Sequence, residues 1–123
     1  MRSTSDRERT VATAQSAFYV LTGVWPLLDR RSFERVTGPK VDFWLVQTVG
    51  VLVASVGIGL ARAALSRRAI PPEVRSIALT SAGGLALLDT MFVLRGRISS
   101  VYLLDALAEG ALVVGWLRSR PTG

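Results

Sequence analysis

The feature that most constrains this chain is the gathering of its apolar residues into four long blocks separated by short charged segments. We place the blocks at about residues 11–28, 43–61, 74–94 and 98–117. Each holds about 18–21 residues, close to the roughly 20 with which a helix crosses the hydrocarbon core of a bilayer. The pattern predicts an all-α fold, a four-transmembrane-helix antiparallel bundle, with the lipid bilayer as its first partner.

The segments outside the blocks are short. Residues 1–10 are predicted to form a polar N-terminal tail or a helical lead-in, and residues 119–123 a C-terminal tail. Residues 11–118 would then form a single domain. Between the first two blocks, Arg30 to Val36 is predicted to form a short amphipathic helix on the membrane surface.

Composition excludes several kinds of chemistry. The 123 residues contain no cysteine and no histidine, which removes thiolate and imidazole metal ligands and the commonest general base. The net charge of +6 comes from arginines at the ends of the blocks, as expected of head-group anchors, and no stacking platform suggests nucleic acid. We predict no metal, no cofactor, no nucleic-acid partner, no catalytic residue and no enzyme activity.

The positive charges predict an orientation. Four spans place both termini on one side of the membrane, and that side carries nine of the basic residues. The other side carries six, namely Arg30, Arg31, Arg35, Lys40, Arg95 and Arg97. Because cytoplasmic segments are enriched in Lys and Arg, we expect a multi-pass protein of the plasma (inner) membrane with cytoplasmic termini.

Three carboxyl side chains lie inside apolar blocks: Asp89 in the third, and Asp105 and Glu109 in the fourth. A charge near the bilayer centre costs at least about 2.5–3.5 kcal/mol, so such residues usually face the bundle interior. Asp89 and Asp105 each lie eight residues from Arg97, the centre of the predicted turn, and therefore fall at one depth in an antiparallel hairpin. Glu109 shares a helix face with Asp105, one turn deeper.

The same depth count brings polar residues of the first two blocks close to the acids. These are Thr22, Gln47 and Thr48 near the aspartates, and Tyr19 near the glutamate. Gln47 and Thr48 point in different directions, so at most one of them is expected to face the acids. We predict a proton- or ligand-binding site made of Asp89, Asp105, Glu109, Tyr19 and Thr48.

The acids have more than one interpretation. Two neighbouring aspartates do not both ionise at low cost, so the site could hold a proton, a cation or a cationic, amphipathic or lipid-like small ligand. The protein would then be a small transporter that works as a homo-oligomer. Alternatively, Arg62, Arg95 or Arg97 pairs with the acids, which then only specify helix packing in a structural or accessory scaffold. A lipid-modifying enzyme is the third interpretation, without a metal site, nucleophile or cofactor motif to support it.

Two further patterns concern packing. Trp25, Trp44 and Trp116 lie near block ends and are predicted to form an interfacial aromatic belt. Gly50 and Ala54 are small residues four apart, which predicts the close approach of a neighbouring helix.

Three stretches of the chain share a layout with known membrane proteins: Trp25-Pro26-Leu27-Leu28 with Phe33, Thr37-Gly38-Pro39-Lys40 with Trp44-Leu45-Val46, and Leu88-Asp89 with Tyr102-Leu103-Leu104-Asp105 and Glu109. In this layout the chain resembles the DoxX-like group, small bacterial four-helix integral membrane proteins of unknown function. The resemblance implies a four-helix membrane fold and assigns no role to any residue.

Overall fold

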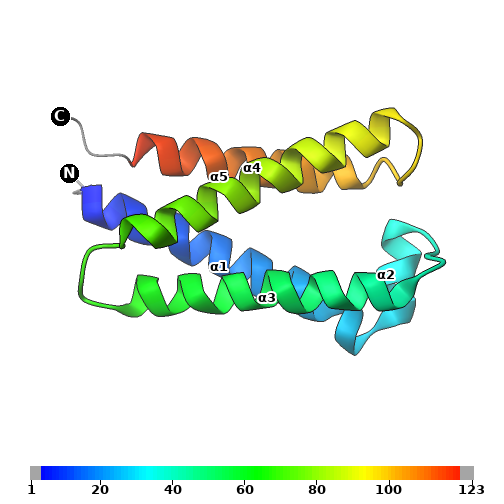
Figure 1. Ribbon diagram of the computed structural model, residues 1–123, viewed down its shortest axis with the longest axis horizontal. Coiled ribbons are helices and arrows are strands. Elements are labelled where there is room, and N and C mark those ends of the chain that lie inside the picture. Colours follow the sequence, from blue (N-terminus) through cyan, green and yellow to red (C-terminus); the bar gives the residue numbers. More distant parts are fainter. Residues whose placement is uncertain (1–3, 120–123) are drawn as a thin grey trace.

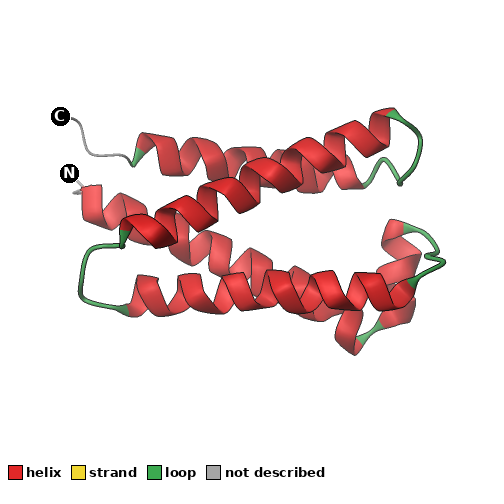
Figure 2. Ribbon diagram, viewed as in Figure 1, coloured by secondary structure: helices red, strands yellow, loops and turns green. Residues whose placement is uncertain are grey.

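The computed structural model describes residues 4–119, and within that range every regular element is a helix (Figure 2). The helices are α1 (Thr4–Leu28), α2 (Arg30–Thr37), α3 (Phe43–Leu65), α4 (Pro72–Leu94) and α5 (Tyr102–Arg118). The prediction of an all-α fold is confirmed, and the short helix expected after the first block is present as α2. Residues 1–3 and 120–123, which include most of the predicted C-terminal tail, lie outside the described residues.

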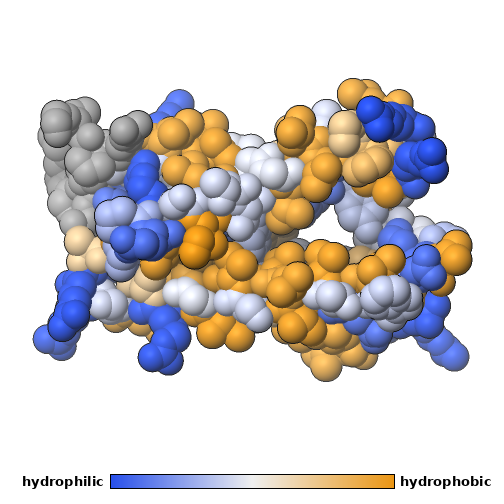
Figure 3. All heavy atoms as spheres, viewed as in Figure 1, coloured by the Kyte–Doolittle hydropathy of each residue, from blue (hydrophilic) through white to orange (hydrophobic). Residues whose placement is uncertain are grey.

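Within the described range, three helices are long and apolar enough to cross a membrane: α1, α3 and α4. Their outward faces carry large apolar side chains such as Leu21, Leu52 and Leu87, each more than half exposed. Figure 3 shows apolar residues in the middle of the molecule and hydrophilic ones toward both ends. A surface of this kind fits lipid better than water, which indicates that the protein associates with a membrane.

The helix boundaries differ from the predicted ones at several places. Helix α1 begins at Thr4, so most of residues 1–10 form the helical lead-in that was the alternative to a tail. Helix α3 continues to Leu65, beyond the predicted end of the second block at about residue 61. Helix α5 begins at Tyr102 and not at Ile98, and with 17 residues it is shorter than the other long helices. The reason lies in the preceding turn. The carbonyls of Ser99, Ser100 and Val101 accept from the N–H groups of Tyr102, Leu103 and Leu104, so the chain makes tight turns before the regular helix starts.

The two ends of α4 follow from local chemistry. Pro71 and Pro72 begin the helix, where a missing N–H costs nothing, and the Glu73 carboxylate meets the positive end of the helix dipole. At the other end Gly96 adopts a φ of 69°, and the Arg97 N–H donates to the Phe92 carbonyl at 2.9 Å. This left-handed glycine reverses the chain into α5.

The long helices form two pairs, α1 with α3 and α4 with α5. The first pair is very close at Gly50, where an added Cβ would lie 2.5 Å from the Gly23 carbonyl oxygen. The close approach predicted for Gly50 and Ala54 is therefore present, and its partner is α1. At Gly59, on the same helix, an added Cβ would meet nothing within 4 Å.

A cluster of buried apolar residues lies at one end of the bundle. It comes from α1, α3, α4, α5 and the α3–α4 connection: Ala12, Leu60, Ala64, Ile70, Ala78 and Trp116. Trp116 is fully buried, so its predicted place in an interfacial belt is wrong. Trp44, by contrast, is 63% exposed near the start of α3.

Figure 1 shows how the pairs are arranged. The start of α1, the α3–α4 connection and the end of α5 lie together at what we call the closed end. Helix α2 and residues 95–101 lie at the opposite, open end, where the two pairs diverge. The core cluster is at the closed end, which leaves the helices apart at the open end.

Candidate functional site: a cleft with three carboxyl groups

A cleft of about 510 Å³ separates the two helix pairs at the open end, and Figure 3 shows the gap that it makes in the molecular surface. One wall comes from α1, α2 and α3 and is apolar and aromatic, with Phe18, Trp25 and Phe33 among its residues. The other wall comes from α4 and α5. That wall carries the three acids of the apolar blocks: Asp89, Asp105 and Glu109.

Asp89 and Asp105 lie within hydrogen-bonding reach of each other across the α4–α5 pair. The Asp89 Oδ2 atom is buried, and no donor among the described residues reaches it. Two carboxylates have only acceptor atoms, so they hydrogen-bond to each other only when one of them carries a proton. The pair therefore needs a proton or a cation between its oxygens to avoid a repulsive contact.

Glu109 is held in a different way. Its side chain is 1% exposed, and the Tyr19 hydroxyl donates to Glu109 Oε2 at 2.8 Å. Tyr19 is itself 1% exposed, so this hydrogen bond ties α1 to α5 inside the bundle. Glu109 also lines the cleft together with Asp105, which places it between the closed end and the aspartate pair.

A second polar network lies at the closed end. Gln15 is fully buried, donates from Nε2 to the Ala78 carbonyl at 3.1 Å and accepts from Trp116 Nε1 at 2.7 Å. One side chain thus joins α1, α4 and α5. Because both ends of the Gln15 amide have partners, this network stabilises the bundle at low cost.

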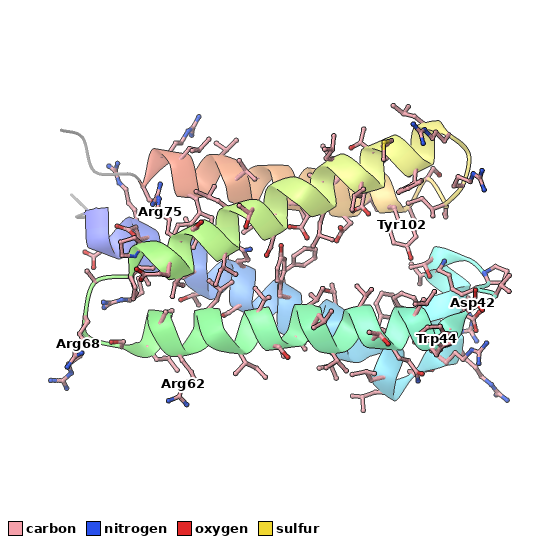
Figure 4. All side chains as sticks on the ribbon, in the orientation of Figure 1. Asp42, Trp44, Arg62, Arg68, Arg75 and Tyr102 are labelled. Atoms are coloured by element: carbon pink, nitrogen blue, oxygen red, sulfur yellow. The ribbon has the colours of Figure 1, made fainter. Side chains whose placement is uncertain are left out.

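Arg75 continues this network toward the end of the bundle. Its guanidinium donates to the Trp116 carbonyl and to Ser119 Oγ, and it lies 3.8 Å from Glu8 Oε2. It also lies over the Trp116 ring, with Cζ 5.5 Å from the ring centroid. Figure 4 shows Arg75 where the start of α4 meets α1 and α5. These contacts anchor the α4–α5 pair to α1.

Helix α2 and its connection border the mouth of the cleft. Lys40 Nζ donates to the carbonyls of Thr37 and Gly38, at 2.9 and 3.0 Å, and lies 5.3 Å from the centroid of the Tyr102 ring. In Figure 4, Tyr102 extends from the start of α5 toward this segment. Burial lowers the pKa of Lys40. This contact joins the two helix pairs at the open end.

The fold of α2 is fixed by its own carboxylates. The Ser32 N–H donates to Asp29 Oδ1 at 3.1 Å, which caps the helix and lowers the pKa of Asp29. The Lys40 N–H donates to Glu34 Oε2 at 2.7 Å, and Arg30 Nε donates to Oε1 at 2.7 Å. These bonds lower the pKa of Glu34. Asp29 and Glu34 thus hold α2 and the turn that follows it in place beside the cleft.

The structure brings four of the five predicted site residues together: Asp89, Asp105, Glu109 and Tyr19. Thr48 does not join them, because its side chain is exposed and its hydroxyl donates to the Trp44 carbonyl of its own helix. Gln47 is exposed as well. Thr22, from α1, lines the cleft in their place.

No arginine forms an ion pair with the three acids within residues 4–119. Figure 4 shows Arg62 directed away from the bundle at the closed end. The arginine partner that the scaffold interpretation expected is therefore not found in the described part of the chain. The same residues hold no group of three Asp or Glu placed to ligate one metal ion.

The sequence did not reveal the closed-end polar network of Gln15, Trp116, Arg75 and Ser119. Gln15 lies four residues before Tyr19, so the two share a face of α1. A polar side chain at that spacing inside an apolar block was the available signal. For Trp116, nothing in the sequence distinguished a buried indole from an interfacial one.

Comparisons with known protein families, with characterised proteins and with solved structures found no match to this chain. The resemblance to the DoxX-like group therefore stays a prediction.

Proposed function

We propose that this protein is a multi-pass protein of the plasma membrane whose cleft takes up and releases a proton or a cation on its carboxyl groups. In this proposal α1, α3, α4 and the shorter α5 all cross the bilayer, as a four-span bundle. At 17 residues, α5 is at the lower limit of a membrane span. The excess of basic residues on the side predicted to carry the termini favours cytoplasmic termini.

The observation that carries the proposal is the buried Asp89 Oδ2 beside the Asp105 carboxyl, without a donor among the described residues. An unsatisfied buried carboxylate oxygen is costly, and a like charge next to it adds to that cost. A proton shared by the pair removes both penalties. A cation in the cleft does the same, so the two compete for one place.

Glu109 fits this scheme as the deepest acid. The Tyr19 hydroxyl satisfies one of its oxygens, and the cleft reaches its side chain from the open end. A charge that moves between the aspartate pair and Glu109 would travel along one wall of the cleft. Transport across the bilayer would need an assembly of several copies, because the closed end blocks a path through a single bundle.

The Tyr19–Glu109 hydrogen bond also favours a second candidate, an accessory scaffold whose acids only fix helix packing. This bond joins two helices in the interior, as a packing contact does. The two candidates differ at Asp89, whose Oδ2 atom is buried without a donor among the described residues. A scaffold gains nothing from a buried carboxyl oxygen that has no donor.

Infrared spectroscopy of the full chain in lipid nanodiscs tests the proposal. The C=O stretch of a protonated carboxylic acid should be present in the wild type and weaken when a monovalent cation is added at fixed pH. Asp89→Asn and Asp105→Asn should each remove this band. In these variants, addition of the cation should no longer release protons to the medium. Glu73→Gln, an exposed acid in the first turn of α4, is the matched control and should change nothing.

The proposal would be refuted by a carboxyl spectrum that responds to neither pH nor cations. It would also be refuted if the spectrum of the Asp89→Asn variant responded in the same way as that of the wild type. Fixed hydrogen bonds would then account for the acids. The scaffold would replace the proton and cation site as the function.

A further inference from the structure

The geometry of the cleft points to a class of ligand, and we propose that it binds an organic cation with an apolar body and not a metal ion. Protonated lipophilic amines and quaternary ammonium or phosphonium ions belong to this class. The inference rests on the proposed function, since it concerns the same carboxyl groups. Three features of the cleft support it: its size, the aromatic wall opposite the three acids, and the charge of the residues that line it.

The size of the cleft suits a small organic molecule. About 510 Å³ lies within the roughly 300–1,000 Å³ of small-molecule pockets, whereas a bare ion would leave most of the space unfilled. The apolar residues on its walls include Val49, Val53 and Leu85. Covering these side chains is favourable for a ligand with an apolar body and offers nothing to a hydrated ion.

The wall opposite the acids is aromatic. Phe18, Trp25 and Phe33 line it, and the Trp25 and Phe33 rings meet edge to face with centroids 5.2 Å apart. Trp25 Nε1 donates to Ser32 Oγ at 2.7 Å, so this indole is fixed in place. Aromatic faces attract organic cations, and they do so most strongly where water is excluded.

The charge of the walls selects a cation over an anion. Asp89, Asp105 and Glu109 are the charged side chains among the described residues that line the cleft. Lys40, a base that contacts the lining residue Tyr102, donates its ammonium hydrogens to the carbonyls of Thr37 and Gly38. An anion would therefore meet carboxyl groups, and no basic side chain lines the cleft among the described residues.

The spread of the acids argues against a metal ion. A hard divalent cation gathers six or more oxygen ligands around one point. Within residues 4–119 the three acids do not form such a group, and one oxygen of Glu109 is bound by the Tyr19 hydroxyl. Carboxyl groups spaced along a wall suit instead a bulky cation whose charge is diffuse.

The position of the cleft suits a ligand that dissolves in lipid. It lies between the helix pairs at the open end, where Figure 3 shows that the gap reaches the outer surface of the bundle. In a bilayer that opening faces acyl chains and head groups. An amphipathic cation concentrates in this region and could enter sideways, without crossing the closed end.

Binding of radiolabelled tetraphenylphosphonium to the full chain in nanodiscs is the test, with empty nanodiscs subtracted. Tetraphenylborate, which has nearly the same shape and the opposite charge, is the matched ligand control. We expect saturable binding of the cation alone. It should weaken as the pH falls, because protons compete for the same carboxyl groups.

Variants locate the site. Glu109→Gln and Asp89→Asn should each weaken binding about tenfold or more, the loss of one good electrostatic contact, whereas the exposed Glu73→Gln should bind as the wild type does. Phe18→Leu should weaken binding by a smaller factor. Trp44→Leu, a change of an aromatic residue outside the cleft, should not.

Three results would overturn the inference, and they differ in what they leave standing. If alkali cations or protons alter the carboxyl spectrum but tetraphenylphosphonium does not bind, the ligand class is wrong and the proton or cation site remains. If tetraphenylphosphonium does not bind and the carboxyl spectrum responds to neither protons nor cations, both proposals fail together. Equal binding of tetraphenylborate would show that partition into apolar space, and not charge, drives the association.

Discussion

The closed and the open end of the bundle treat buried polar groups in opposite ways. At the closed end, Gln15 satisfies both ends of its amide, and Trp116 donates to it from a fully buried position. At the open end, Asp89 Oδ2 is buried without a donor among the described residues, next to a second acid and an open space.

The two ends of the bundle therefore contribute differently to stability and to binding. A membrane bundle gains little from the hydrophobic effect between its helices, so close packing and satisfied hydrogen bonds must hold it together. The closed end has both, with a core cluster and a polar network in contact. The aspartate pair at the open end has neither, because it borders the cleft and Asp89 Oδ2 has no donor among the described residues. We infer that the first end holds the fold and the second is available for binding.

The largest effect should come from Trp116→Ala. This side chain is fully buried in the core of the closed end, so its removal should cost about 3–5 kcal/mol of unfolding free energy. Trp44→Ala removes the same side chain from a 63% exposed position and should cost much less. Unfolding of both variants by sodium dodecyl sulfate in mixed micelles measures the difference. Equal losses would show that the core does not lie where the structure places it.

The next effect concerns the contact between α1 and α3. In Gly50→Ala the new methyl group would meet the Gly23 carbonyl oxygen at 2.5 Å, and separating the helices should cost about 1–3 kcal/mol. Gly59→Ala places the same methyl group on the same helix in open space. It should leave stability unchanged or raise it slightly, because alanine favours helix. The same unfolding assay applies, and a stable Gly50→Ala variant would refute the close approach.

A smaller loss is expected from Gln15→Met. The change keeps the length of the side chain but leaves Trp116 Nε1 and the Ala78 carbonyl without their partner. Hydrogen bonds between membrane helices contribute about 0.6–2 kcal/mol, which sets the expected loss. Gln47→Met, at an exposed position on α3, is the control. If both variants are as stable as the wild type, the closed-end network does not stabilise the fold.

The smallest effect is local to α2 and depends on pH. Because the folded-state pKa values of Asp29 and Glu34 are lowered, their stabilisation of α2 is complete above the ordinary carboxyl range of about pH 4–5. It is lost as the pH falls through the lower folded-state values. Hydrogen exchange at the Ser32 and Lys40 amides should therefore speed up below that range, relative to intrinsic rates.

Glu34→Gln removes the ionised form and supplies the control for that measurement. In this variant the Lys40 amide should exchange faster above pH 5 already, with little further change on acidification. If the Lys40 amide exchanges at the same rate in the variant and in the wild type at every pH, Glu34 does not hold the turn.

The helices were largely predictable because apolar blocks of about 20 residues favour helices long enough to cross a bilayer. Phe43 starts α3 after Asp42, which occupies the N-cap position without a side-chain capping hydrogen bond, and Leu94 ends α4 before the Arg95-Gly96-Arg97 turn. The start of α5 was not predictable, since hydrophobicity continues through the turn at Val101. Helix α1 began early because charged residues in a first turn are compatible with helix and give no stop signal.

Part of the site was predictable for a similar reason. Helix rise alone fixes depth, which correctly brought Asp89 and Asp105 to one layer and Tyr19 to Glu109. Rotation about the helix axis is set by packing, and a depth count contains no information on it. Thr48 shows the consequence, because it lies at a suitable depth on a face of α3 that points outward.

The most direct test of the division between the two ends is the unfolding free energy of Asp89→Asn, measured beside the wild type in the same micelles. If the acid serves binding and not packing, the variant should be within about 1 kcal/mol of the wild type or more stable, because no hydrogen bond from a described residue is lost at Oδ2. A loss of about 3–5 kcal/mol, as expected when one partner of a buried charged pair is removed, would make Asp89 a packing element and contradict the account.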